Sequence, residues 1–227
     1  MSGQRFEIEI KSLLGSEEQA HRFKYQLTTK VRSEIKLKAF STQLNHYFQQ
    51  GDVHKLYKTL AKSFKPKALS QLRNIIKNGN DISVRTREIN GEVRLVLKAS
   101  VGTDSSANGI ARMEFEEPVN MTLEKLDAKV ESAGYRCQAK WSRERDEYQV
   151  GGMSICFDRN AGYGYLVEFE KVISDARKIP AAKREIKNFM RTLRVKELPQ
   201  SRLEKMFKHY NENWSKYYGT REVFNLP

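Results

Sequence analysis

The chain of 227 residues is 39% hydrophobic and 30% charged, which is enough apolar sequence for one large or two small domains with a buried core. No apolar run approaches the ~18 residues of a membrane-spanning helix, the polar, acidic N-terminus does not resemble a secretory signal, and the two cysteines, Cys137 and Cys156, exclude a disulfide framework or a cysteine-rich metal site. We therefore expect a cytoplasmic protein without a membrane partner, and its net charge of +13 favours polyanionic ligands such as nucleic acid, nucleotide phosphates or polyphosphate.

The first predicted element is a strand over residues 6–11, FEIEIK, in which apolar and charged residues alternate strictly. Successive side chains of a strand point to opposite faces, so the apolar residues at even positions share one face. Glu7, Glu9 and Lys11 share the other face. The apolar face is expected to meet a core, whereas the charged face meets either water or a ligand that requires charge.

A helix is predicted over residues 15–30, with Ser16 as its N-cap. Residues 33–40 alternate again, which predicts a strand that continues through residue 48. By parity alone, Lys36 and Lys38 are expected to add cations to its charged face.

Residues 52–78 have helical spacing, and Pro66 divides them into two helices. This segment lies within the most basic part of the chain, residues 19–80, where 13 Lys and Arg stand against 2 acidic residues and give +11. A basic segment of this kind is typical either of a surface for polyanions or of a lysine-rich face in contact with water.

Residues 81–100 form two alternating runs joined at Asn90-Gly91, which predicts a β-hairpin. Its charged face carries Arg85, Arg87, Arg94 and Lys98. A loop is predicted over residues 102–109.

The next strand is predicted over residues 111–119, with Arg112, Glu114 and Glu116 on one face. A capped amphipathic helix is then expected over residues 122–134, ending at Gly134.

A long strand is predicted over residues 135–150, with Trp141, Arg143 and Arg145 on one side. Two further strands follow around the turn NAGYG, and the second carries Glu168 and Glu170. The remainder of the chain is predicted to be largely helical.

About eight antiparallel strands with several helices predict an α+β protein built on a closed or nearly closed sheet. Nearly every strand has one apolar and one charged face. In an open antiparallel sheet the charged faces would simply meet solvent. In a closed barrel they would point inward, and the outward apolar faces would need helices to cover them.

A closed barrel of this composition would have one acidic wall, with the rest of its interior basic. Unpaired buried charges cost several kcal/mol each. Such an interior therefore suits a polyanion held by arginine and lysine, with Mg²⁺ or Mn²⁺ bridging it to the carboxylates. A water-filled polar pore is the alternative, but it does not account for the separation of the two signs.

The order of these motifs resembles the CYTH superfamily, the triphosphate tunnel metalloenzymes. EIEIK (7–11) is similar to the family's ExExK signature, which alone is a weak signal. The following segments resemble its later strands in order: SVRTRE (83–88), LVLKA (95–99), MEFEE (113–117), SRERDEY (142–148) and ICFDRNAGYGYLVEFE (155–170). The last segment is most similar to the branch of class IV adenylyl cyclases and thiamine triphosphatases.

The resemblance covers residues 5–173 and implies a tunnel domain over 1–173, with a helical insert at 52–78 and a helical C-terminal extension over 174–227 that packs on the barrel. It implies catalytic roles for Glu7, Glu9 and Lys11. It implies triphosphate binding by Arg85, Arg87, Lys98, Arg143 and Arg145, to which parity adds Arg94. Expected metal ligands are Glu7, Glu9, Glu168 and Glu170, with Glu114, Glu116 and Asp158 as further acidic candidates. For each arginine, a salt bridge to a glutamate of a neighbouring strand is the alternative.

Three functions agree with this pattern. The first is hydrolysis of a nucleoside triphosphate or inorganic triphosphate, the second is conversion of ATP to cyclic AMP and pyrophosphate, and the third is binding of polyphosphate, nucleotide or an RNA 5′ end without catalysis. Hydrolysis requires no placement of a ribose hydroxyl, and a protein that only binds would need no paired carboxylates for a metal. We therefore expect a metal-dependent triphosphatase, with the cyclase as the first alternative.

Overall fold

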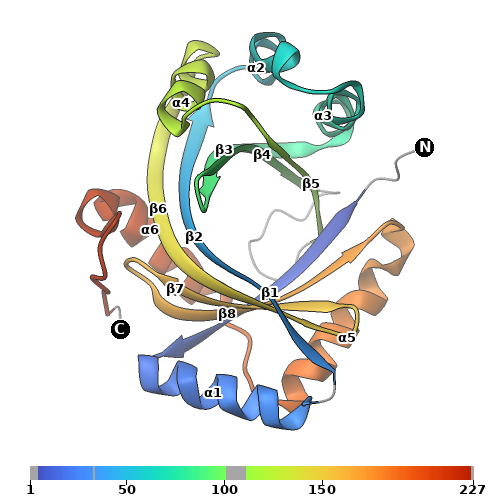
Figure 1. Ribbon diagram of the computed structural model, residues 1–227, viewed down its shortest axis with the longest axis vertical. Helices are drawn as coiled ribbons and strands as arrows, with labels where there is room; N and C mark the ends of the chain where they lie inside the picture. Colours follow the sequence, from blue (N-terminus) through green and yellow to red (C-terminus); the bar gives the residue numbers. More distant parts are fainter. Residues whose placement is uncertain (1–4, 33, 101–110, 226–227) are drawn as a thin grey trace.

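The computed structural model describes residues 5–32, 34–100 and 111–225. Eight antiparallel strands close into one barrel in the order β1-β5-β4-β3-β2-β6-β7-β8 (Figure 1). The strands are β1 (Phe6–Gly15), β2 (Ile35–Gln50), β3 (Asn80–Ile89), β4 (Glu92–Ser100), β5 (Ala111–Pro118), β6 (Tyr135–Val150), β7 (Met153–Asn160) and β8 (Gly164–Ile173). The predicted α+β barrel of about eight strands is therefore confirmed, whereas the loop predicted at 102–109 lies outside the described residues.

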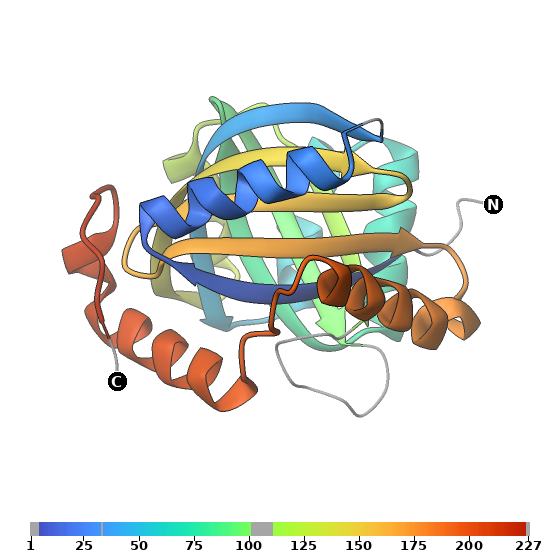
Figure 2. The same cartoon turned by 90° about the horizontal axis from the view of Figure 1, so that it is seen from below.

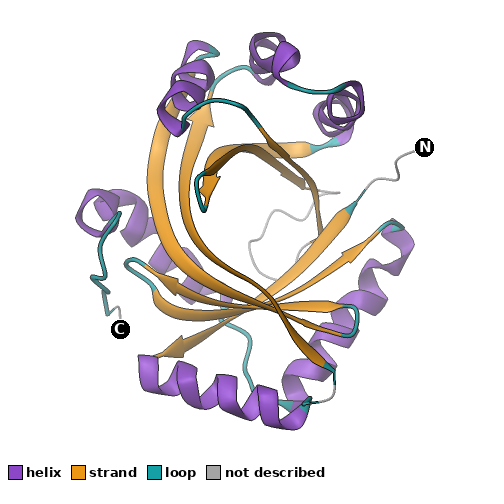
Figure 3. Ribbon diagram, in the orientation of Figure 1, coloured by secondary structure: helices purple, strands orange, loops and turns teal. Residues whose placement is uncertain are grey.

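The helices lie around the outside of the barrel (Figure 3). They are α1 (Glu17–Lys30), α2 (Val53–Leu60), α3 (Pro66–Asn78), α4 (Leu123–Ser132), α5 (Ile179–Thr192) and α6 (Gln200–Tyr217), with short 3₁₀ turns at η1 (Ala61–Ser63) and η2 (Ala176–Lys178). In the part of the chain that the structure describes, no helix has both the length and the apolar character needed to cross a membrane.

Alternation in the strands determines which way the barrel closes. In β1 the side chains of Phe6, Ile8 and Ile10 are buried on the outer face, where they join apolar clusters beneath the helices. The charged residues between them point into the barrel. A strand with this pattern can bury both faces only if helices cover its apolar side.

Three apolar clusters join the helices to the barrel. α2, α3 and α4 cover the outer face of β3, β4 and β5 (Figure 1), while α1 and α5 cover β1, β7 and β8 (Figure 2). α6 packs against β6 through a cluster centred on Trp141 and Tyr210. The helical segment at 52–78 therefore supplies part of the main core, because Leu56 and Leu72 are buried against the strands.

Local signals set the ends of several elements. Ser16 caps α1 by accepting a hydrogen bond from the backbone N–H of Gln19, whose side chain accepts one from the backbone N–H of Ser16 in return. Pro66 occupies the first turn of α3, as its missing N–H allows, so the predicted division of 52–78 is confirmed. Asn90 and Gly91 both have positive φ, 50° and 87°, as the tight turn between β3 and β4 requires.

The packing of α4 predicts a large effect of truncating Leu126, a residue of this helix whose side chain is fully buried against the barrel. Leu126→Ala should lower the free energy of unfolding by about 2–5 kcal/mol, because it removes apolar contacts and leaves a cavity. Leu37→Ala is the matched control, since Leu37 is 62% exposed, and it should change the value by no more than about 0.5 kcal/mol. Urea unfolding of both variants measures the difference, and equal effects would contradict the assignment of this core.

Candidate active site inside the barrel

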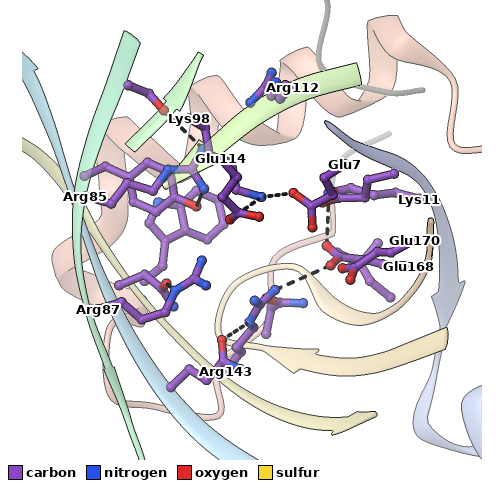
Figure 4. A pocket seen from close by; sticks show the side chains of 18 of the residues that line it. Glu7, Lys11, Arg85, Arg87, Lys98, Arg112, Glu114, Arg143, Glu168 and Glu170 are labelled. Carbon is purple, nitrogen blue, oxygen red and sulfur yellow. Dashed lines mark hydrogen bonds and ion pairs between the residues drawn. The ribbon is translucent and has the colours of Figure 1, made fainter. Parts of the chain in front are cut away.

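The barrel encloses a cavity of about 590 Å³, which lies within the range of small-molecule sites. All eight strands contribute inward side chains to its wall, and Leu203, Glu204 and Phe207 of α6 contribute as well. Figure 4 shows Glu7, Glu168 and Glu170 on one side of this cavity and Arg85, Arg87 and Lys98 across from them. The cavity is therefore charged, with the two signs on opposite walls.

Strand order produces this separation. β8, β1 and β5, which contribute most of the carboxylates of the wall, are consecutive around the barrel, and so are β4, β3, β2 and β6; β7, between β6 and β8, contributes the neutral Asn160. The second group carries most of the cations, together with the carboxylates Asp81 of β3 and Glu147 of β6, whereas β2 contributes only neutral residues, namely Gln43, Asn45 and Tyr47. Lys11 of β1 and Arg112 of β5 are cations within the acidic group of strands.

Most cations of the cavity bridge to a carboxylate. Lys98 Nζ lies 2.5 Å from Glu7 Oε2 and 3.1 Å from Glu114 Oε1. Arg87 donates to Glu116 Oε2 at 2.7 Å and to Asn45 Oδ1 at 2.6 Å. These bonds fix the direction of the side chains, and they reduce the cost of keeping the charges away from water.

Arg143 and Arg145 are held from beneath by Asp158, which is 1% exposed. Arg145 donates to both carboxylate oxygens of Asp158, at 2.6 and 2.7 Å, and Arg143 donates to Oδ2 at 2.7 Å. Arg145 also forms a close ion pair with Glu168. Asp158 therefore orients two guanidinium groups and does not itself line the cavity.

Arg85 and Arg112 differ from the other cations, since neither has a carboxylate partner within the described residues. The guanidinium of Arg85 stacks over the ring of Tyr47, 4.3 Å from its centroid, and donates to the Tyr47 hydroxyl at 3.2 Å. Its Nε is buried and, in the described part of the chain, has no hydrogen-bond partner. Burial and the nearby charge of Arg85 lower the pKa of Arg112. Arg85 and Arg112 therefore bring positive charge to the cavity without an ion pair to a described carboxylate.

A possible metal position lies on the acidic wall, where Glu7, Glu9 and Glu170 each offer an oxygen within 4.8 Å of the others. Glu168 is less available, because Lys11, Arg143 and Arg145 all contact it. An all-oxygen donor set of this kind suits Mg²⁺ or Mn²⁺.

The carboxyl groups of the cavity have widely different pKa values. Burial opposes ionisation of Glu7, but Lys98 outweighs it and lowers the pKa to about 2. Burial raises the pKa of Glu170 to about 8, with the charges of Glu7 and Glu168 acting in the same direction. Burial also raises the pKa of Glu114. Such separated values are typical of functional sites.

Twelve of the residues proposed from sequence line one cavity, namely Glu7, Glu9, Lys11, Arg85, Arg87, Lys98, Glu114, Glu116, Arg143, Arg145, Glu168 and Glu170. Arg94 does not line it; this side chain pairs with Glu92 and lies 3.6 Å from Glu116. Lys36 and Lys38 are exposed at the start of β2, and neither reaches the cavity.

Sequence reasoning did not identify the neutral residues of the wall. Gln43, Asn45 and Tyr47 alternate along β2 and could have been found by the same parity that revealed the charged faces. Tyr163 lies in the turn after β7, and Phe207 comes from α6. No local pattern places either of these two residues at the barrel interior.

Comparison with known proteins gives one family and a set of similar folds. The profile of the CYTH domain family matches residues 5–202. No curated protein sequence matches the chain. Among solved structures, a candidate adenylate cyclase of Vibrio parahaemolyticus is 16% identical with a TM-score of 0.60, covering 91% of this chain and 99% of its own.

Two archaeal structures are similar to the same degree. The PH1819 protein of Pyrococcus horikoshii is 21% identical with a TM-score of 0.59, covering 89% of this chain and 99% of its own. A conserved hypothetical protein of Pyrococcus furiosus is 21% identical with a TM-score of 0.60, covering 84% of this chain and 91% of its own. At these identities the likeness shows the fold alone.

The raised pKa of Glu170 predicts a pH dependence of stability in the absence of metal. Between about pH 4.5 and 8 the folded chain keeps a proton that the unfolded chain releases, so the free energy of unfolding falls as the pH rises. Glu170→Gln should remove this fall, of the order of a few kcal/mol, and stabilise the protein at pH 8. Urea unfolding in EDTA at pH 5 and pH 8 measures it.

At pH 5 the wild type and Glu170→Gln should be nearly equally stable, because Glu170 is then protonated. This gives the experiment an internal control. Two stability curves that run parallel from pH 5 to pH 8 would show that Glu170 is not the group that titrates.

Proposed function

The chain belongs to the CYTH domain family, and on that premise we propose that it is a divalent-metal-dependent triphosphatase. Its substrate is a nucleoside triphosphate or inorganic triphosphate, from which it removes the terminal phosphate. The observation that carries this proposal is the cavity with opposed walls, in which uncompensated arginines face three clustered carboxylates. A triphosphate with a bound divalent ion matches both walls at once.

The phosphate chain is held by the basic wall. Arg85 and Arg112 form no ion pair with a described carboxylate, so a phosphate beside them gains attraction without breaking one. Arg87, Lys98, Arg143 and Arg145 complete the wall, with their side chains already directed by carboxylate and amide partners. Arginine can bind two phosphate oxygens at once, which fixes the orientation of the chain.

Glu7, Glu9 and Glu170 are the residues that would hold the divalent ion. When bound, Mg²⁺ or Mn²⁺ would neutralise the charge that develops on the phosphoryl oxygens. Lys11 pairs with Glu9 and, at 3.0 Å, with Glu168, so it keeps both carboxylates in place.

Hydrolysis also requires a group that accepts a proton from water. Glu114 lines the cavity 3.1 Å from Lys98 Nζ, and its raised pKa makes it a better proton acceptor near neutral pH than Glu7. We assign it this role. The water oxygen forms a bond to the terminal phosphorus, its proton passes to Glu114, and the bridging P–O bond breaks so that phosphate separates from the remaining diphosphate.

The products of the reaction with ATP distinguish a triphosphatase from a cyclase. Incubation of the protein with ATP and Mg²⁺ or Mn²⁺ should give ADP and phosphate. Cyclic AMP with pyrophosphate would instead assign the activity suggested for the structurally similar Vibrio parahaemolyticus protein. A third outcome is that ATP, tripolyphosphate and RNA 5′-triphosphate all bind with measurable affinity but are not converted. This outcome would indicate a binding protein.

Removal of one metal-binding carboxylate should abolish turnover. Glu7→Gln is expected to lower kcat at least a hundredfold and to leave the fold intact, because the amide keeps the shape but loses the charge. EDTA should have the same effect on the wild type, reversed by Mg²⁺ or Mn²⁺. Glu117→Gln, on the same barrel but outside the cavity wall, is the control; a Glu7→Gln variant with undiminished release of phosphate would refute the metal role.

The uncompensated charge of Arg85 gives a second prediction. Arg85→Gln should weaken binding of tripolyphosphate by about ten- to a hundredfold, the effect of losing a charge-assisted hydrogen bond. Arg136→Gln is the matched control, because Arg136 is exposed and does not line the cavity. Isothermal titration calorimetry without metal measures both affinities, and equal values for the two variants would contradict the assignment of Arg85.

A further inference from the structure

One part of the cavity wall is neutral. Trp141 of β6, Asn160 at the end of β7 and Tyr163 in the following turn all line the cavity. Each side chain is more than nine-tenths buried or at that limit, with 9%, 8% and 7% of its surface exposed. We call these three residues the Trp141 subsite.

Each residue of the Trp141 subsite has a polar atom without a partner. Within the described residues, Trp141 Nε1, Asn160 Nδ2 and Tyr163 Oη are buried and form no hydrogen bond. An unsatisfied buried polar atom destabilises a protein by about 1–3 kcal/mol, so native structures contain few of them. Three such atoms in residues that line one cavity, two of them on rings whose centroids are 4.8 Å apart, indicate a ligand that completes these bonds.

The chemistry of the Trp141 subsite differs from that of the phosphate-binding wall. Trp141 Nε1 and Asn160 Nδ2 are neutral donors, and burial raises the pKa of Tyr163, so its hydroxyl stays protonated and can also donate. A phosphate is drawn to the neighbouring arginines and lysines. Neutral donors instead suit the carbonyl oxygens and ring nitrogens of an uncharged organic group.

Aromatic rings surround the Trp141 subsite. Phe207 of α6 lines the cavity, is 38% exposed and lies nearly parallel to Trp141, with ring centroids 6.0 Å apart. Tyr47 lies 5.9 Å from Trp141 on another side. Flat apolar surfaces beside hydrogen-bond donors are suited to a planar heteroaromatic ring.

The Trp141 subsite also borders the phosphate-binding wall. The ring of Tyr47, which contacts Trp141, carries the guanidinium of Arg85 on its face at 4.3 Å. Arg143 is paired with Asn160 across β6 and β7. One molecule with a phosphate chain and a planar ring can therefore contact both regions of the same cavity.

We propose that the Trp141 subsite binds the base of a nucleoside triphosphate, so that the substrate is a nucleotide and not inorganic triphosphate. The phosphate end of this assignment rests on the proposed function, whereas the base end rests on the unpartnered polar atoms and the rings around them. The donors select bases that present acceptor atoms, and the remaining space of the cavity accommodates the sugar.

The test compares two ligands in single-atom variants. Tyr163→Phe and Trp141→Phe remove the Oη and Nε1 donors but keep aromatic rings in the cluster. Affinities for the non-hydrolysable β,γ-imido analogue of ATP and for tripolyphosphate are measured by isothermal titration calorimetry. Each variant should weaken binding of the ATP analogue by roughly threefold to tenfold, as for one hydrogen bond, and leave binding of tripolyphosphate unchanged.

Tyr210→Phe is the matched control. Tyr210 belongs to the same aromatic cluster and stacks on Trp141, but its hydroxyl donates to the backbone carbonyl of Lys140 and it does not line the cavity. It should leave the ratio of the two affinities at the wild-type value. If Trp141→Phe fails to fold, Tyr163→Phe alone decides, because removal of one hydroxyl leaves the ring packing in place.

The outcomes separate this proposal from the proposed function. If the variants bind both ligands more weakly by the same factor, or bind neither more weakly, the base-binding assignment is wrong even where the wild type hydrolyses ATP. If the variants lose affinity only for the ATP analogue, the assignment stands even where no triphosphate is turned over. Because binding is measured without catalysis, an absent triphosphatase activity does not affect the result.

Discussion

The structure depends on the pairing of charge across the interior of a closed barrel. Inward-pointing carboxylates and cations are kept from most of the surrounding water, and a buried ion without a partner is strongly unfavourable. The strand order reduces this cost by placing β8, β1 and β5, which carry most of the carboxylates, together, and most of the cations on the strands across the cavity. Short bridges such as Lys98 to Glu7 then compensate most of the charge. Arg85 and Arg112 form no ion pair with a described carboxylate, and they are the cations that we propose for the phosphate chain.

Filling the barrel with charge has a consequence for its outside. The outer faces of the strands carry the apolar residues, so helices must cover the barrel on several sides, and they do so through three apolar clusters. The pair α2 and α3 and the C-terminal α5 and α6 each bury part of this surface. α6 contributes in addition to the wall of the cavity through Phe207, so the same helix serves the core and the candidate site.

Much of this arrangement could be predicted from sequence, because strict alternation reveals both the strands and the charged face of each one. Parity correctly grouped Glu7, Arg85 and Arg143, which lie far apart in the chain but line one cavity. Parity shows which face of a strand a residue occupies but not how deeply it is buried or how far along the strand the cavity extends. It therefore could not show that Asp158 is buried behind Arg143 and Arg145, or that Lys36 does not reach the cavity. It also could not find Phe207, whose position depends on how α6 docks.

The stacked guanidinium of Arg85 and its neighbour Arg112 place positive charge in the cavity that forms no ion pair with a described carboxylate. Anything that binds only the native state stabilises it by mass action, by about 2.7 kcal/mol when its concentration is a hundred times the dissociation constant. A polyanion bound in this cavity, as we propose, would therefore increase the free energy of unfolding. The melting temperature of the chain would then rise with the concentration of the proposed ligand.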